Sequence, residues 1–253
     1  MNLLTYVIIA VVLIFVIKNL MPLYYKNKSR NEFKNGSYSD AKKHYEKAMS
    51  LEKQNFNSKI EYTYMLLRMG LFEDALHVTE TTLAYKLEPQ NRSKAILQRC
   101  MCYYKTGNFD EAYNDICQLY DDGYRSMAMY GLMGLFKILK DPNSEDTYNF
   151  CLEAYDYADD DRDICDNMTI CYYNRAEYEK AKKISDTVIE KNPSFIEGWY
   201  HGAQIDYAMG NYKSAKNKLD KISDCTRSPM TTISESDVNS YMEKVSLKLK
   251  ENN

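Results

Sequence analysis

Hydrophobic residues are distributed differently at the two ends of the chain. From Leu3 to Ile17 the only polar side chains are the hydroxyls of Thr5 and Tyr6. The segment 234–250 instead places apolar residues at helical spacing, which predicts an amphipathic helix with one buried face. Ser234 is its expected N-cap, because a serine hydroxyl can accept a hydrogen bond from a free backbone N–H.

A six-residue signature recurs between these ends: glycine, any residue, an aromatic residue, any two residues, and alanine. Four complete copies and a fifth, in which Ala176 replaces the glycine, follow at steps of 34, 37, 69 and 34 residues. The step of 69 leaves room for one more unit without the signature. Such a period indicates a stack of like units, none of which buries its apolar face alone. The signature residues are Gly36 and Ala41, Gly70 and Ala75, Gly107 and Ala112, Ala181, and Gly210 and Ala215.

Each type of signature residue has a physical reason. Glycine tolerates a positive φ and can therefore end the first helix of a unit at a tight turn. Alanine lets the second helix approach the first closely, and the preceding aromatic ring fills the remaining space. Acidic residues such as Asp74 fall in the first turn of the second helix, where the helix dipole favours negative charge.

This pattern resembles the tetratricopeptide repeat (TPR), a helix–turn–helix unit of about 34 residues. The resemblance covers residues 22–226. It implies an all-α, right-handed superhelical solenoid of about six TPR-like repeats, of which the fourth is degenerate. We expect the turn of the fourth repeat at 141–143, and the three extra residues between the second and third repeats in a loop at 87–92. Residues 227–253 then form a loop and a C-terminal capping helix.

The apolar opening segment predicts a transmembrane anchor over residues 1–21, with residues 3–21 in the membrane. Fifteen helical residues rise only about 22 Å, but Leu20 and its neighbours extend the apolar length toward the roughly 30 Å of a hydrocarbon core. A cleaved signal peptide is one alternative, but no basic residue precedes Leu3 and no small-residue cleavage site follows the run. A buried first helix of the solenoid is the other, but nothing nearby is apolar enough to cover it.

Positive charge lies on one side of this anchor. Lys18, Lys26, Lys28 and Arg30 follow the apolar run, which predicts a single-pass membrane protein with its repeats facing the cytoplasm. The seven cysteines are scattered and odd in number, which agrees with a reducing compartment. Translocation of the whole repeat region despite these flanking charges is the alternative topology.

Composition and motifs give no support for catalysis, a cofactor, a metal ion or nucleic-acid binding. The net charge is −3 and no basic stripe is present, so we expect no nucleic-acid partner. No phosphate-binding loop or nucleophile elbow occurs, so we expect no enzyme. The three histidines lie in different repeats and are expected to be structural. The acidic cluster 159–161 lacks the glycine and closing glutamate of a calcium loop, and we expect it to cap the next helix.

The resemblance assigns the concave face of the solenoid to the first helices of the repeats. With the register taken from the turns, this face carries tyrosine, methionine and aliphatic side chains with little charge. Tyrosine offers a large contact area with few rotatable bonds, and methionine adapts to varied partners. Packing in the core between repeats is the alternative interpretation. The predicted groove residues are Tyr64, Leu67, Met101, Tyr104, Leu135, Tyr173, Tyr200 and Tyr207, with Ile138, Ile170 and Gln204 in the same rows.

Chaperone-binding members of the family hold a partner's C-terminal carboxylate with a clamp of Lys, Asn and Arg. The matching positions here are Lys26, Arg30, Glu61, Lys94 and Gln98, and Glu61 would repel a carboxylate. An apolar or amphipathic segment is therefore the favoured ligand of the groove. We expect a membrane-anchored protein–protein interaction scaffold whose partner the sequence does not name. The alternatives are a receptor or assembly factor for nascent or translocating proteins, and an outward-facing envelope assembly component.

Overall fold

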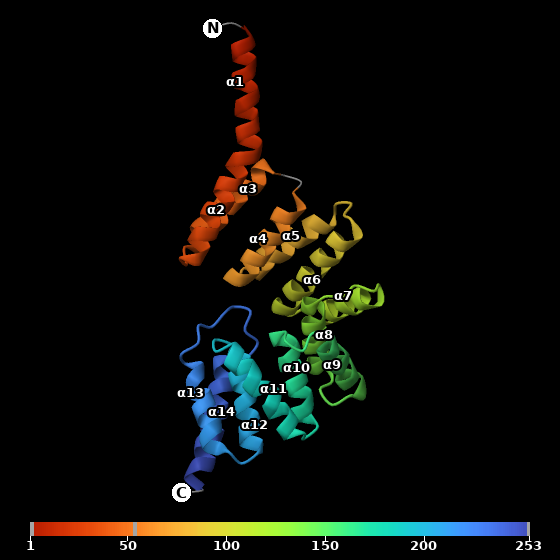
Figure 1. The fold of residues 1–253 in the computed structure, drawn as a ribbon, viewed down its shortest axis with the longest axis vertical. Helices are drawn as coiled ribbons and strands as arrows, with labels where there is room; N and C mark the ends of the chain where they lie inside the picture. Colours follow the sequence, from red (N-terminus) through yellow and green to blue (C-terminus); the bar gives the residue numbers. More distant parts are fainter. Residues whose placement is uncertain (1–2, 53–54, 252–253) are drawn as a thin grey trace. The chain divides into compact units, whose positions relative to one another are not determined.

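The computed structural model describes residues 3–52 and 55–251, and the regular structure within these ranges is entirely helical (Figure 1). The all-α prediction is therefore confirmed. The chain forms two compact units, Met1–Asp115 and Ile116–Asn253, and the division between them falls inside a helix, α7 (Phe109–Asp121).

The first unit begins with a helix that continues into the first helical pair without a break. α2 packs against α3, and α4 packs against α5, while α6 lies against both α4 and α5. The elements of this unit before α7 are α1 (Leu3–Phe15), the π-helical segment η1 (Val16–Leu20), α2 (Met21–Lys34), α3 (Tyr38–Leu51), α4 (Phe56–Met69), α5 (Phe72–Leu83) and α6 (Pro89–Lys105).

The second unit repeats the same pairing. α8 packs against α9, α10 against α11, and α12 against α13, while α14 follows as a single helix against α13. The elements of this unit after α7 are α8 (Met127–Lys140), α9 (Glu145–Tyr157), α10 (Arg162–Asn174), α11 (Tyr178–Lys191), α12 (Ile196–Ala208), α13 (Tyr212–Ile222) and α14 (Glu235–Glu251).

The turn inside each signature follows one hydrogen-bonding scheme. After α4, Gly70 has φ 78°, and the amide of Leu71 donates to the carbonyl of Leu66 at 2.9 Å. This closes the helix in a Schellman motif, which requires a left-handed residue. Ala176 takes the same place with φ 58°, the only positive φ of a non-glycine residue among those described. The signature alanines at 41, 75, 112, 181 and 215 are all completely buried.

The fourth repeat lacks the signature but has the expected helices. Its turn lies between Lys140 and Glu145, in agreement with the expected position. The insertion between the second and third repeats differs from our expectation, because Pro89 to Arg92 form the first turn of α6 rather than a loop. Proline suits the first position of a helix, where its missing N–H is not needed and its φ is already helical. The connecting loop is 84–88.

The expected terminal helix is present as α14. The amide of Asp237 donates to Ser234 Oγ at 3.1 Å, and the amide of Ser234 donates to Asp237 Oδ2 at 2.9 Å. This reciprocal capping confirms Ser234 as the N-cap. Val245 is completely buried against a cluster that includes Ile196 and Leu219, so α14 covers the apolar end of the last repeat.

The opening segment is exposed along its apolar length. Leu3–Lys34 forms one continuous helical stretch of 32 residues, and none of its most apolar 18-residue window is buried. Its length and composition suffice to cross a membrane. Signal sequences share this apolar composition, so the crossing of a membrane by this helix stays a prediction.

Candidate functional site

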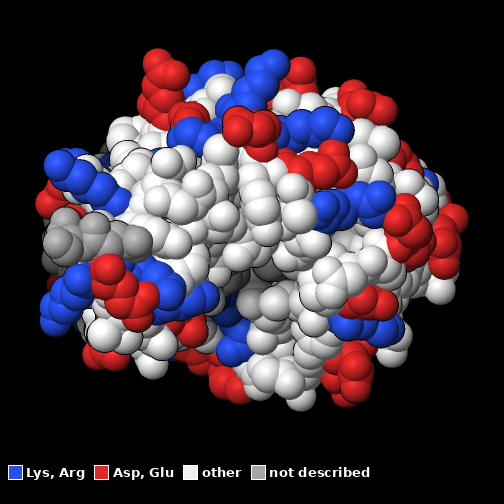
Figure 2. Space-filling model, turned by 90° about the horizontal axis from the view of Figure 1, so that it is seen from below, with Lys and Arg blue, Asp and Glu red and all other residues white. Residues whose placement is uncertain are grey.

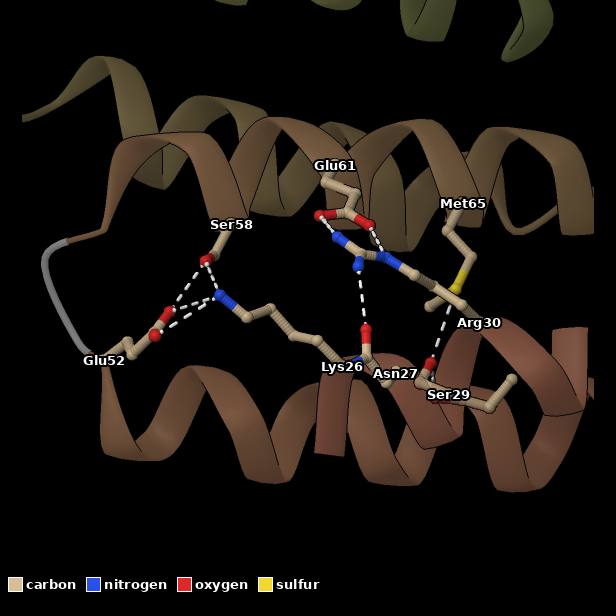
Figure 3. Close-up of polar contacts among 9 residues, drawn as sticks. Lys26, Asn27, Ser29, Arg30, Glu52, Ser58, Glu61 and Met65 are labelled. Carbon is tan, nitrogen blue, oxygen red and sulfur yellow. Dashed lines mark hydrogen bonds and ion pairs between the residues drawn. The ribbon is translucent and has the colours of Figure 1, made fainter. Parts of the chain in front are cut away.

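Three of the five clamp positions, Lys26, Arg30 and Glu61, are engaged in ion pairs within the chain (Figure 3). Lys26 Nζ on α2 donates to Glu52 Oε2 at 3.0 Å and to Ser58 Oγ at 3.2 Å. Arg30, one turn further along α2, donates through Nη2 to Glu61 Oε2 at 2.7 Å and also pairs through Nε with Oε1. Both cations therefore already have a carboxylate partner.

These pairs decide what this part of the surface can bind. Burial alone would raise the pKa of Glu61, but the hydrogen bonds and charge of Arg30 outweigh it and hold the pKa below its ordinary value. Glu61 is therefore ionised at neutral pH and competes with any incoming carboxylate for Arg30. Gln98 Nε2 donates to the carbonyl of Ile60 at 2.8 Å, which leaves the exposed Lys94 as the remaining cation among the five clamp positions. The clamp positions therefore offer few cations to bind a partner's C-terminal carboxylate.

The predicted groove residues of the first unit differ in exposure. The side chain of Tyr64 is 55% exposed, and Arg68 Nη1 donates to its hydroxyl at 3.2 Å. Met101 and Tyr104 are half-buried on α6. Leu67 is only 3% exposed, so its side chain belongs to the packed interior and offers almost no surface to a partner.

Three predicted groove residues of the second unit come together around a tyrosine of α14. The ring centroid of Tyr241 lies 5.6 Å from that of Tyr200 and 5.7 Å from that of Tyr207, both in edge-to-face geometry. Tyr173 on α10 is near enough to Tyr241 to influence its titration. All four side chains are half-buried, so each keeps part of its ring at the surface. We call Tyr173, Tyr200, Tyr207 and Tyr241 the tyrosine cluster.

Charged groups beside the tyrosine cluster include Lys244 and Asp237, both on α14. Burial raises the pKa of Tyr173, Tyr200 and Tyr241, so these hydroxyls stay protonated at neutral pH. Lys244 Nζ lies 4.7 Å from the ring centroid of Tyr207 and 5.1 Å from that of Tyr241. The surface therefore combines partly exposed aromatic rings with a cation near two of them and a carboxylate near Tyr200, and it suits a protein segment better than a small charged ligand.

Sequence reasoning missed Tyr241 and Lys244 because they lie on the capping helix. By its spacing, Tyr241 falls on the apolar face predicted for the helix 234–250, which we expect to be buried. The structure places its ring against two residues that the repeat register had already assigned to the groove. The spacing of residues within α14 does not predict this contact between Tyr241 and the groove. Treating α14 as the first helix of a further repeat would have predicted it.

The other rows of the predicted groove are mainly interior. Ile138 is buried in a cluster with Met168, and Ile170 packs against that cluster. Leu135 is half-buried on α8, whose neighbours are buried on almost every side. The tyrosine cluster is thus the part of the predicted set that the second unit assembles.

A four-charge network joins helices of the last two repeats. Asp206 on α12 has a side chain only 1% exposed, and it accepts from Lys182 at 3.1 Å, from Lys218 at 3.0 Å and from Ser214 at 2.7 Å. Asp186 on α11 also pairs with both lysines, at 2.9 Å and 2.8 Å. The network joins α11, α12 and α13, so it fixes the last two repeats to each other.

Two of the three histidines have structural partners. His201 Nδ1 lies 2.8 Å from Asp166 Oδ1, and His44 Nδ1 lies 2.7 Å from Glu32 Oε2. In the acidic cluster, Asp161 Oδ1 accepts from the amides of Asp163 and Ile164 at 3.1 Å, which confirms it as the cap of α10. No group of three or more potential metal ligands occurs within residues 3–52 and 55–251.

Charged side chains are mixed on the face seen in Figure 2. Lysine and arginine side chains there lie next to aspartate and glutamate around an uncharged area. Such mixing gives no long-range field of one sign on that face.

Comparison with known proteins identifies the fold. No protein-family model and no curated protein sequence matches the chain. The subunit structure of the APC/C hetero-tetramer Cut9–Hcn1 is similar with a TM-score of 0.70 at 11% identity, over 92% of this chain and 45% of that one. A TPR protein from Parabacteroides merdae is similar with a TM-score of 0.59 at 16% identity, over 92% of both chains. A TPR protein from Thermus thermophilus is similar with a TM-score of 0.59 at 14% identity, over 76% of this chain and 100% of that one. The chain therefore has the TPR fold.

Proposed function

We propose that this chain is a membrane-anchored scaffold that binds protein partners on the first-helix surfaces of its repeats. The observation that carries the proposal is the tyrosine cluster, in which partly exposed rings of α12 and α14 pack edge to face and Tyr173 of α10 lies near enough to act on Tyr241. Clustered, partly buried tyrosines are typical hot spots of protein–protein interfaces. The TPR fold supports the proposal, because solenoids of this kind present extended binding surfaces.

Membrane attachment is the second part of the proposal. Leu3, Leu13 and Phe15 are each more than half exposed, and such a row of apolar side chains is favourable in a bilayer and unfavourable in water. Lys18 and Lys28 follow the apolar run, so the repeats face the cytoplasm under this proposal.

Photo-crosslinking from a groove position tests the binding surface. Benzoylphenylalanine replaces Tyr173 in the full-length chain in its native membranes, and the matched control replaces Tyr157, which is 51% exposed on the second helix α9. We expect discrete crosslinked products from position 173 that are absent from position 157. A ladder of many products that disappears when translation is stopped supports the receptor for nascent chains instead. Equal products, or none, at the two positions refute the groove.

Protease access tests the topology. The loop 223–234 separates α13 from α14 and contains Arg227, a site for trypsin. We expect trypsin to cleave this loop only after the membrane has been permeabilised. Cleavage in intact cells shows that the repeats face outward and supports the envelope assembly component.

A further inference from the structure

A pocket in the first unit is lined by basic and aromatic side chains. It has a volume of about 320 Å³ and lies between the start of α4 and the α5–α6 loop. Lys59 Nζ sits 4.1 Å from the ring centroid of Tyr85, and burial lowers the pKa of Lys59. Neither Lys59 nor Lys86 forms an ion pair with another described residue. The lining residues are Phe56, Lys59, Thr82, Tyr85, Lys86 and Leu87.

The hydrogen bonds between α2 and α4 fix the height of this pocket along the unit. Lys26 contacts Ser58, and Arg30 contacts Glu61, so α4 runs parallel to α2 with residue 58 beside residue 26. Phe56 to Lys59 therefore lie level with residues 24–27 of α2. Figure 1 shows the start of α4 and the α5–α6 loop at the end of the unit that carries α1.

The same height corresponds to the headgroup layer of a bilayer. Twenty helical residues from Leu3 rise about 30 Å, the thickness of the hydrocarbon core, and end at Pro22. The polar layer beyond is about 5–7 Å thick, which takes in the next four or five residues of α2. Exposed Leu23 and Tyr24 lie in this interval, where tyrosine is favoured. The pocket lies level with them.

We infer that this pocket binds the anionic phosphate headgroup of a lipid in the membrane that holds α1. Lys59 and Lys86 pair with the phosphate, while Phe56, Tyr85 and Leu87 contact the glycerol and the upper acyl chain. Glu52 is paired with Lys26, and the described residues that line the pocket include no carboxylate. The inference rests on the proposed anchor, because only the anchor sets the pocket at this height.

The test uses the full chain in lipid nanodiscs. Amide hydrogen exchange of residues 84–91 is measured in discs of phosphatidylcholine alone and in discs with 30% phosphatidylglycerol. Two lysines near an anionic surface give a preference on the order of tenfold or more, so we expect exchange in the mixed discs to slow by about that factor. The K59Q/K86Q variant removes the slowing. The matched control K34Q/K43Q removes two exposed lysines at the far end of the unit and keeps it.

Three results overturn the inference while the anchor remains intact: equal exchange in both kinds of disc, equal loss in the control variant, and slowing by inorganic phosphate in phosphatidylcholine discs. The last of these marks a site for free anions rather than for lipid. Failure of the chain to enter either kind of disc overturns the proposed anchor, and the lipid site with it. Insertion without lipid-dependent protection overturns the lipid site alone.

Discussion

Replacing Asp206 by alanine removes the centre of the four-charge network. The carboxylate is 1% exposed and accepts hydrogen bonds from Lys182, Lys218 and Ser214. Each hydrogen bond to a charged group contributes about 1.5–3 kcal/mol, but removing the carboxylate also removes the free energy of its desolvation. Asp186 remains as a partner for both lysines. We therefore expect the D206A variant to lose about 3 kcal/mol, the lower end for a broken buried ion pair.

Urea unfolding of the full-length protein in detergent measures this loss. Trp199 is the single tryptophan of the chain and lies on α12, so its fluorescence reports the repeat that contains Asp206. The matched control is D186A, which contacts the same two lysines through a carboxylate that is 48% exposed. An exposed ion pair contributes about 0–1 kcal/mol, so the control should unfold nearly as wild type does. Equal midpoints for D206A and D186A would refute the reasoning that burial makes the difference.

The pH dependence of the same variant has a definite sign. Burial acts to raise the pKa of Asp206, but the hydrogen bond from Ser214 and the charges of Lys218 and Lys182 outweigh it and hold the pKa below its ordinary value. A depressed carboxyl pKa stabilises the folded state above the unfolded pKa of about 4. The difference between wild type and D206A should therefore persist at neutral pH and shrink as the pH falls below about 4.

Three further predictions concern other sites. Ala176→Gly should raise the free energy of unfolding by about 1 kcal/mol and so raise the unfolding midpoint, because an L-residue at φ 58° is strained and glycine is not; a lower midpoint would contradict this. Gly134→Ala should destabilise the fold by about 1–3 kcal/mol, because the new Cβ would lie 2.6 Å from Asn167 Nδ2. That amide donates to a carbonyl of α8 and is held in place by this bond. An unchanged melting curve would show that the Asn167 side chain moves aside freely. Burial acts to lower the pKa of His201, but Asp166 outweighs it and raises the pKa above its ordinary value. The stability advantage of wild type over His201→Gln, followed by thermal melting against pH, should therefore be complete below about pH 6 and decline as the pH rises through the folded pKa; an advantage that grows with pH has the wrong sign.

The turns were predictable because local chemistry determines them. Gly70 ends its helix in the left-handed conformation that the signature requires, and the same signature placed Ala176 correctly although alanine does not favour that conformation. Pro89 shows the limit of local interpretation, since proline fits both a loop and the first turn of a helix. Here three extra residues lengthen α6.

The candidate surface was less predictable because it depends on packing between helices. Tyr64 and Leu67 are three residues apart on one helix, yet one is exposed and the other is buried against neighbouring helices. Two residues three apart differ in direction by about 60° around the helix axis. The sequence does not show which of the two directions the neighbouring helices bury. Tyr241 joined the cluster for the same reason. The right-handed superhelix and the partner stay predictions.

Under the proposed membrane anchoring, the unbroken passage from α1 through η1 into α2 would couple the orientation of the first repeat rigidly to that of the anchor. A flexible linker would let the repeats sample all directions above a bilayer, whereas a continuous helix gives them one azimuth. Each residue of helix turns the chain by about 100° and lifts it by about 1.5 Å, so one residue added within the anchor would swing the first repeat to another side. The π-helical turn at Val16–Leu20 is the kind of segment that absorbs such a residue without breaking the helix. Under the proposed anchoring, the direction in which the first repeat faces therefore depends on two things, the number of residues in the anchor and the π-helical turn that can accommodate one of them.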